Sequence, residues 1–382
     1  MHRNSSSISS SDGAGRQRIR RSLSTLGCML LSLAVLDLAI GFVFGNPYGR
    51  DPERVVQLTR YFDYGRSIEG KVRAMAGADG STAHPLAQAG WIAAPAGQPD
   101  RPGKDQDLLI AVYGMSFAAN IVRRVQELDP RIAVRVAGGP AAALSHSYAM
   151  YMADRGRHEA RVVVLGILAS SLPGLVTTTH MTWNFEGPSP HFYPRFTVAD
   201  GSLVEFRPSV ATLPELQAIL RDESRWQTLI GEIAANDEFY DPLVFNSWSL
   251  DGSIVARLAR RGWGQKSKRA TLERFHRGDG FTNELGLRDV AQALVSSFIV
   301  QVRNDGKLPV IVAINDRGYA DHLHQILRPA VRDDLAVYLS THELAPATDS
   351  GNFLKDGHFT PAKDRLVGRR LAALINARLD RR

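Results

Sequence analysis

The sequence predicts an α/β protein built on a parallel sheet of about five strands, and two observations carry this prediction. Short apolar runs alternate with helical patterns in two stretches, residues 107–171 and residues 287–378. The runs are apolar at successive positions rather than at alternate ones, which is typical of parallel strands covered by helices on both faces. Between the stretches this rhythm breaks, so we expect an insertion at about residues 175–285.

Each element follows from the spacing of apolar residues and from its length. In the first stretch we expect strands at residues 108–113, 132–137 and 161–168, with helices at 117–128 and 141–154. In the second we expect helices at 287–303, near 319–327 and at 361–378, with strands at 308–314 and 335–340. The insertion should hold a hairpin at 195–207 that turns at Asp200-Gly201, one or two helices within 213–233, and a basic, solvated helix or loop at 262–277.

The N-terminal region predicts a membrane anchor. Residues 1–25 hold five Arg and one Asp and lack apolar periodicity, so we expect a disordered basic tail. Residues 26–45 form an apolar run that only Asp37 interrupts, and at about 1.5 Å per residue it just spans a bilayer core of about 30 Å. A cleaved signal peptide or a buried core helix are the alternatives; the length of the run favours an uncleaved anchor.

Charge asymmetry sets the expected topology. The Arg residues that precede the run should stay in the cytoplasm, which places the C-terminal domain in the periplasm or outside the cell and the anchor in the inner (cytoplasmic) membrane. Residues 46–105 should then form a helical stalk, near 51–75, and a Gly/Pro/Ala-rich linker. The main α/β domain should occupy residues 106–382.

Composition excludes several classes of function. The net charge is +7, but the N-terminal tail supplies +4 of it, so the domain offers little basic surface for a nucleic acid. Cys28 is the only cysteine, which rules out an intrachain disulfide and thiolate zinc or iron–sulfur sites. We therefore expect no nucleic-acid partner and no metal.

Ser116 is the candidate nucleophile. It follows the first predicted strand within Gly114-Met115-Ser116, where a parallel sheet has its ligand crevice and where the next helix presents free N–H groups. The alternative is that Ser116 only caps that helix.

His358 is the candidate base, and Asp356 is the candidate carboxylate that orients it. They follow the last predicted strand and precede the final helix, so they should emerge at the same edge of the sheet as Ser116. A serine nucleophile needs a base, and the base needs an acceptor that orients its ring. A helix cap is again the alternative.

Taken together, Gly114-Met115-Ser116 and Asp356-Gly357-His358 resemble the first and last sequence blocks of the SGNH (GDSL-like) hydrolase superfamily. This resemblance implies a three-layer α/β/α sandwich and a Ser116–His358–Asp356 triad. It also implies that the backbone N–H of a glycine after the second strand, Gly138 or Gly139, joins the oxyanion hole; we choose Gly139 because it precedes Pro140.

Two positions depart from the superfamily's pattern. Met115 replaces its Asp, and no Asn follows the third strand, where Ser170, Ser171 or the later Asn184 could donate instead. A missing donor of this kind costs on the order of 3 kcal/mol of transition-state stabilisation.

The resemblance implies a membrane-anchored serine esterase or O-acyltransferase without a cofactor. Its expected substrate is an acylated cell-envelope glycan or another small ester. The alternative is a weak or inactive member that binds polysaccharide in an envelope assembly.

Four further groups of residues carry predictions of lower weight. Trp183 to Tyr193 should be either a lid or sugar-stacking wall or a loop packed on the domain. Asp316 and Arg317 should either bind substrate or serve as a helix cap. His322 and His324 should point apart. His146, His180 and His191 lie near the loops that follow the second and third strands, and His180 or His191 could line the crevice, but surface histidines are the default expectation.

Overall fold

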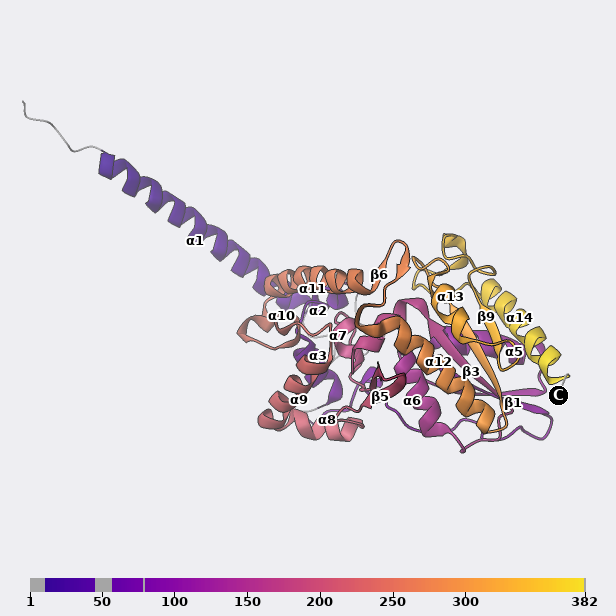
Figure 1. Cartoon of the computed structure of the whole chain (residues 1–382). Helices are drawn as coiled ribbons and strands as arrows, with labels where there is room; N and C mark the ends of the chain where they lie inside the picture. Colours follow the sequence, from indigo (N-terminus) through magenta and orange to yellow (C-terminus); the bar gives the residue numbers. More distant parts are fainter. Residues whose placement is uncertain (1–10, 45–56, 78–79, 381–382) are drawn as a thin grey trace, which may run out of the picture.

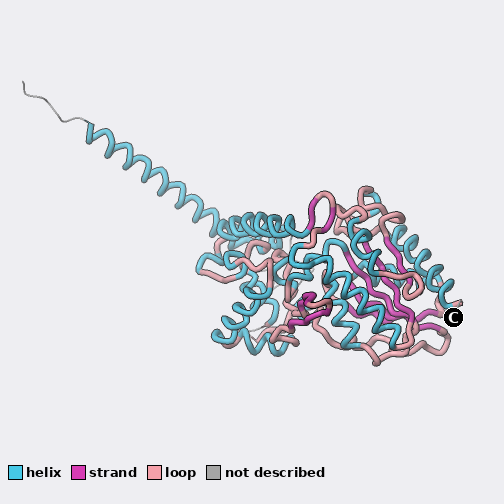
Figure 2. Tube along the Cα trace, in the orientation of Figure 1, coloured by secondary structure: helices cyan, strands magenta, loops and turns pink. Residues whose placement is uncertain are grey.

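The computed structural model describes residues 11–44, 57–77 and 80–380, and Figure 1 shows its arrangement. A long N-terminal helix projects from a body that has two parts. One part surrounds a parallel sheet and the other is mostly helical, as the helix and strand colours of Figure 2 show.

The sheet has five parallel strands in the order β2-β1-β3-β8-β9. Its strands are β1 (Leu108–Gly114), β2 (Ile132–Gly138), β3 (Val162–Leu168), β8 (Leu308–Ile314) and β9 (Val337–Ser340). The predicted α/β class and five-strand parallel sheet are confirmed.

Helices pack on both faces of this sheet because its strands are apolar on both faces. The helices are α5 (Ser116–Leu128), α6 (Leu144–Asp154), α12 (Leu287–Asn304), α13 (His322–Leu327) and α14 (Pro361–Leu379). Ile110 and Val112 of β1 share one buried cluster with residues of α5 and α14, whereas Ala111 and Leu165 share another with residues of α6 and α12. Helix α14 lies against α5, so the last helix stands beside the helix that begins at Ser116.

The predicted insertion is present between β3 and β8. It holds the 3₁₀ segment η3 (Ala169–Val176), the expected hairpin β4 (Arg195–Ala199) and β5 (Ser202–Phe206), and a short hairpin β6 (His276–Arg277) and β7 (Gly280–Phe281). Its helical segments are α7 (His180–Trp183), α8 (Leu213–Leu220), α9 (Glu223–Asn236), α10 (Pro242–Phe245), η4 (Ser249–Gly252) and α11 (Ile254–Phe275). Residues 213–233 thus form two helices, and the basic segment 262–277 belongs mainly to one long helix.

The segment expected as a helical stalk is helical where the structure describes it, and it packs into the body. Residues 57–76 form α2 (Gln57–Asp63) and α3 (Ile68–Ala76), and α4 (Pro85–Gln88) follows. Ile68 and Val72 are buried in one cluster with Trp226 and Phe245 of the insertion. Their apolar side chains therefore complete the core of the helical part, and residues 46–56 lie outside the described ranges.

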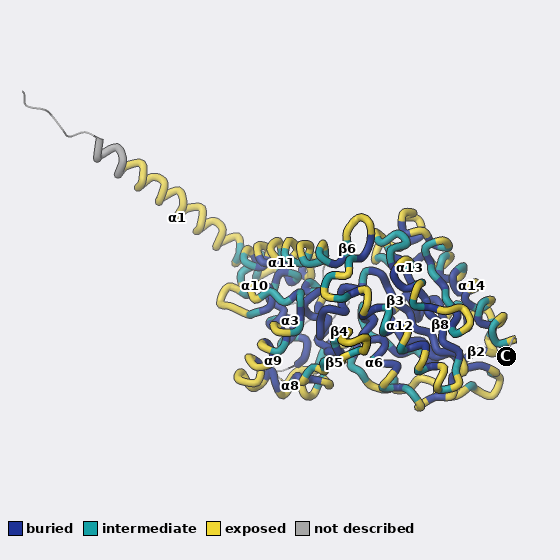
Figure 3. Tube along the Cα trace, viewed as in Figure 1, coloured by how far each residue is buried: buried dark blue, intermediate teal, exposed yellow. Residues whose placement is uncertain are grey.

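The N-terminal tail also differs from the prediction. Helix α1 runs from Ser11 to Phe44, so residues 11–25 are helical rather than disordered, while residues 1–10 lie outside the described ranges. A helix that the apolar run has already nucleated extends at low cost through Arg, Gln and Leu, which are good helix formers. The portion Gln17–Phe44 is long and apolar enough to cross a membrane, and Figure 3 shows it exposed along most of its length.

Candidate active site

Ser116 stands at the carboxyl end of β1, as the first residue of α5. The residue that caps α5 is Met115, whose side chain makes no capping hydrogen bond, so Ser116 is not the N-cap. The chain turns closely here: a Cβ on Gly114 would lie 2.9 Å from the carbonyl oxygen of Gly166 and 3.1 Å from the Cβ of Ala118. Glycine at position 114 therefore lets β1 and β3 approach while α5 starts at once.

His358 and Asp356 lie in the loop between η7 (Ser350–Asn352) and α14. An antiparallel bridge between Phe353 and Phe359 closes this loop, and the backbone N–H of Leu354 donates to the carbonyl of His358 at 2.7 Å. Gly357 has φ of 92°, which a residue with a side chain adopts only at a cost. The turn therefore holds His358 in a fixed place before α14.

The three candidate residues meet in hydrogen-bonding order. The Oγ of Ser116 lies 2.6 Å from the Nε2 of His358, and the Nδ1 of His358 lies 3.2 Å from the Oδ2 of Asp356. The backbone N–H of His358 also donates to the Oδ1 of Asp356 at 3.2 Å. Each contact fits the geometry that a nucleophile, a base and an orienting carboxylate require.

The electrostatics of the site follow from these contacts. The backbone N–H of His358, and then the proximity of its ring, lower the pKa of Asp356, so this carboxylate is ionised at neutral pH. The His358 side chain is 30% exposed and that of Asp356 is 65% exposed. Ser116 is exposed as well, so the group of three opens to solvent.

The aromatic ring of Phe117 packs against the ring of His358. Phe117, which follows Ser116, stacks on the ring of His358 with centroids 4.8 Å apart, and it meets Phe359 edge-on at 5.2 Å. Phe117 is buried in the core between α5 and the sheet. It therefore couples the position of His358 to the core.

Gly139 follows the last residue of β2, and β2 pairs with β1 so that Gly138 is opposite Gly114. This register places Gly139 at the same edge of the sheet as Ser116. A Cβ on Gly139 would lie 2.9 Å from the Cα of Gly90 and 3.1 Å from the Cε1 of His146. The backbone here is thus packed too tightly to accept a side chain without a shift.

Ser170, one of the residues that could replace the missing Asn as a donor, is bonded to the loop after β8. Its backbone N–H donates to the Oδ1 of Asp316 at 3.0 Å. Asp316 follows β8 rather than capping α13, and burial raises its pKa to about 6. The carboxylate therefore orders the loop after β3.

The other two substitutes are engaged as well. The hydroxyl of Ser171 is buried and donates to the carbonyl of Leu168 at 2.9 Å. The amide nitrogen of Asn184 donates to the carbonyl of Gly187 at 3.0 Å, within its own loop. The structure therefore assigns none of these side chains to an oxyanion.

Sequence reasoning missed a buried histidine cluster. The default expectation of surface positions is wrong for His146, His180 and His191, which are all buried. The rings of His146 and His191 have centroids 5.0 Å apart, and those of His180 and His191 are 5.7 Å apart. Burial lowers the pKa of His146 to about 4 and that of His180 to about 3, so these rings are neutral. No periodic signal marked them, because they come from three separate segments: α6, the four-residue helix α7 and the loop that follows it.

The aromatic segment 183–193 is a packed loop rather than an open wall. Trp183, Phe185, Phe192 and Tyr193 are all buried. The hydroxyl of Tyr193 accepts a hydrogen bond from the Nε1 of Trp183 at 3.1 Å.

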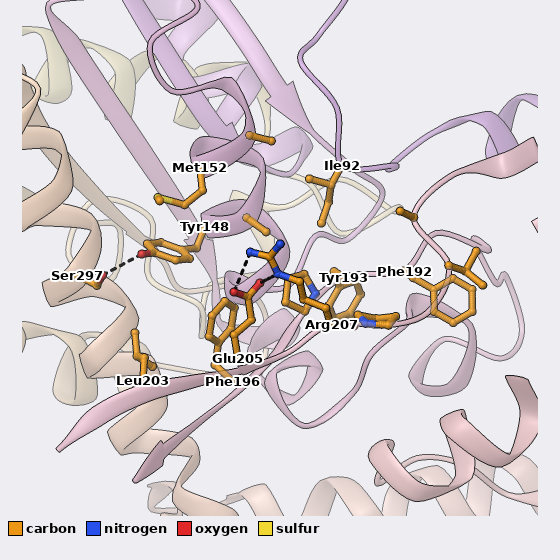
Figure 4. Close-up of a pocket in the computed structure, with 16 residues that line it drawn as sticks. Ile92, Tyr148, Met152, Phe192, Tyr193, Phe196, Leu203, Glu205, Arg207 and Ser297 are labelled. Carbon is orange, nitrogen blue, oxygen red and sulfur yellow. Dashed lines mark hydrogen bonds and ion pairs between the residues drawn. The ribbon is translucent and has the colours of Figure 1, made fainter. Parts of the chain in front are cut away.

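A separate cavity of about 610 Å³ lies between α6 and the β4–β5 hairpin, as Figure 4 shows. Apolar side chains such as Met152 and Phe196 line it, and the ion pair between Glu205 and Arg207 lies beside it. None of the three candidate catalytic residues lines this cavity.

The histidines of α13 point to different partners, as predicted. The Nδ1 of His322 lies 2.9 Å from the Nε2 of His276, whereas the Nδ1 of His324 lies 3.1 Å from the hydroxyl of Tyr338. Across the described ranges, no group of three or more His, Cys, Asp or Glu side chains is placed to hold a metal ion.

Comparison with known proteins adds no relative to this picture. No protein-family model matches the chain, and no curated protein is significantly similar to it.

Proposed function

We propose that the chain is a serine esterase or O-acyltransferase of SGNH type, with the three-layer α/β/α arrangement of that superfamily. One observation carries the proposal: Ser116, His358 and Asp356 come from opposite ends of the domain, yet lie in consecutive hydrogen-bonding contact. The sheet order β2-β1-β3-β8-β9, with α14 beside α5, supports it.

The geometry suits acyl transfer through a covalent intermediate. The Oγ of Ser116 attacks the ester carbonyl while the Nε2 of His358 takes the hydroxyl proton. The ionised carboxylate of Asp356 accepts the Nδ1–H and stabilises the imidazolium. The imidazolium then protonates the departing alcohol, which leaves an acyl group on Ser116.

The second half of the reaction repeats these roles. Water or a sugar hydroxyl attacks the acyl carbonyl, His358 takes its proton, and the proton returns to the Oγ of Ser116. The backbone N–H groups of Ser116 and Gly139 stabilise the oxyanion in both halves, aided by the free N-terminus of α5. This chemistry needs no cofactor.

The substrate that we propose is an acylated cell-envelope glycan, with acetyl as the acyl group. The open site is compatible with a chain-like substrate, since the side chains of Ser116 and Asp356 are exposed. Helix α1 would hold the enzyme in the inner membrane, with the domain in the periplasm or outside the cell.

The test uses the full chain purified in detergent and a short activated ester such as p-nitrophenyl acetate. Ser116→Ala should remove nearly all hydrolysis, and His358→Ala should do so comparably, because members of a triad act as a unit. Asp356→Asn should reduce the rate less. Ser171→Ala is the matched control, since its hydroxyl only bonds the carbonyl of Leu168. Full activity in Ser116→Ala would end the proposal.

A second candidate is a glycan-binding protein with weak or no catalysis. It is favoured by the side chains of Ser171 and Asn184, which donate to backbone carbonyls and so do not replace the missing donor for the oxyanion. It would take first place if the wild type bound acetylated glycan but neither hydrolysed nor transferred the acyl group.

A further inference from the structure

Large apolar side chains are exposed at the end of the body where α1 arrives. Leu250 is 51% exposed and Trp248 is 48% exposed. We define the α10–α11 face as Leu243, Trp248, Leu250, Val255, Leu258 and Trp263, all of which are exposed. Helix α11 contacts α1, α2, α10 and η4, so these residues belong to one region of the surface (Figure 1).

A hydrogen bond joins this face to the anchor. The Oδ1 of Asp37, in α1, accepts from the backbone N–H of Val255 at 2.8 Å, in the first turn of α11. The carboxylate thus meets the positive end of a helix dipole, which favours its charge. The one charge within the apolar run 26–45 has a structural partner.

This contact sets the depth of α11. Asp37 lies seven residues before Phe44, the end of α1, which is about 10 Å along the axis at 1.5 Å per residue. If α1 crosses the bilayer with α11 attached at this level, the part of α1 before Asp37, Gln17–Leu36, spans the core of about 30 Å. The N-terminus of α11 then stands at the outer boundary of that core, where the side chains beside it meet lipid rather than water.

The chemistry of the face fits this environment. Its aliphatic residues are flanked by two tryptophans, a residue type enriched where membranes meet water. Farther along α11, Lys266 and Arg269 are exposed, where they could contact anionic headgroups. The guanidinium of Arg260 lies 5.1 Å from the ring of Trp248 and pairs with Asp251, so it is held beneath the face.

We propose that the α10–α11 face docks on the lipid bilayer that α1 crosses, with Leu250, Val255 and Leu258 entering its outer interface. The domain is then held in one orientation on the membrane instead of swinging on a flexible link. This inference does not depend on the proposed catalysis. It rests on α1 being the membrane anchor.

The experiment measures depth by spin labelling of the full chain in nanodiscs that contain anionic lipid. In a Cys28→Ser background, single cysteines replace Leu250, Leu258 and, as the control, Asp333, whose side chain is 75% exposed on the sheet part. Collision with oxygen, relative to collision with a water-soluble nickel complex, should be several-fold higher at 250 and 258 than at 333.

Native Cys28 supplies the reference for the anchor itself. It is exposed on α1, and its label should show the strongest oxygen preference of all. Water-like values at both 250 and 258, together with a lipid-like value at 28, would overturn the docking and leave the anchor intact. Water-like values at all positions would remove both, and immobile labels without oxygen preference would indicate contact between copies of the chain.

A second readout uses the native tryptophans. Brominated lipid should quench part of the tryptophan fluorescence of the wild type. Trp248→Phe/Trp263→Phe should lose most of this quenching, because Trp183 and Trp226 are buried and Trp91 is partly buried against the core of the helical part. Unchanged quenching in the double variant would contradict the proposal.

Discussion

The imidazole ring of His358 stacks on the phenyl ring of Phe117, with centroids 4.8 Å apart and planes 23° apart. Because Phe117 directly follows Ser116, one short segment supplies the hydroxyl and also supports the ring that faces it. A rotation of His358 away from Ser116 would break this stacking. The contact therefore favours the orientation in which Nε2 faces Oγ.

Phe117→Leu should lower kcat for ester hydrolysis by roughly tenfold, since a loss of about 1.4 kcal/mol in alignment corresponds to that factor. Phe353→Leu is the matched control: both phenylalanines are 7% exposed and both contact Phe359, but only Phe117 stacks on His358. Kinetics and melting temperatures measured together separate positioning from stability. Equal loss of kcat in both variants would show that Phe117 only stabilises the fold.

The buried histidines make stability sensitive to acid. Burial lowers the pKa of His191 well below its usual value, and its Nε2 has no hydrogen-bond partner among the described residues. Below about pH 6.5 the unfolded chain gains a proton at this position that the native state does not, which costs at most ~1.4 kcal/mol per pH unit. The folded state therefore loses stability relative to the unfolded state as pH falls.

His191→Phe should remove this contribution. The melting temperature of the variant relative to wild type should rise steadily as the pH is lowered from 7 to 5. Phe192→Leu, a change at the neighbouring buried residue that carries no titratable group, should show a nearly constant difference over the same range. A pH-independent difference for His191→Phe would mean that this ring titrates normally in the folded protein.

Most of the sheet could be predicted from the sequence because its elements are local and apolar. Strand β8 has the predicted bounds, residues 308–314, and β1 and β2 each extend one residue further than predicted. The meeting of Ser116, His358 and Asp356 could be predicted as well, because parallel strands bring their carboxyl ends to one edge. Its distances depend on the loop around Gly357, which sequence patterns do not resolve.

The features that could not be predicted depend on contacts between residues that are far apart in the sequence. Asp37 interrupts the apolar run, and the sequence alone gives no reason for a charge there. The structure gives one, because the carboxylate of Asp37 accepts a hydrogen bond from the backbone N–H of Val255. Residues 57–76 have a helical pattern that suits a stalk, but their apolar side chains pack with Trp226. Tertiary packing thus decided what local propensity left open.

A buried ion pair under β1 gives a stability prediction. Arg135 contacts Asp154 with two hydrogen bonds, of 2.7 Å and 2.6 Å, and the hydroxyl of Tyr113 donates to the same carboxylate at 2.8 Å. Arg135→Met should destabilise the protein by about 3–5 kcal/mol, because it leaves a buried charge without its partner. Chemical denaturation measures the change.

The double variant Arg135→Met/Asp154→Leu is the control. It should be less destabilised than the sum of the single variants, since the carboxylate that needs the guanidinium is gone. Tyr113 keeps a partner there, because its hydroxyl also lies 2.9 Å from the Nε2 of His158. Strict additivity would show that the two charges do not interact in the folded state.

Membrane topology is the last prediction. The charges before the apolar part of α1 are Arg16, Arg18, Arg20 and Arg21, and positive residues are retained on the cytoplasmic side. Alkaline phosphatase fused after Arg382 should therefore be active in the periplasm, and the same fusion should remain in the membrane fraction after a carbonate wash. Replacing the four arginines with glutamate should lower that activity, because it removes the asymmetry that orients the helix. An active cytoplasmic reporter at the C-terminus of the wild type would contradict the proposed localisation, and release of the fusion into the soluble fraction would indicate a cleaved signal peptide.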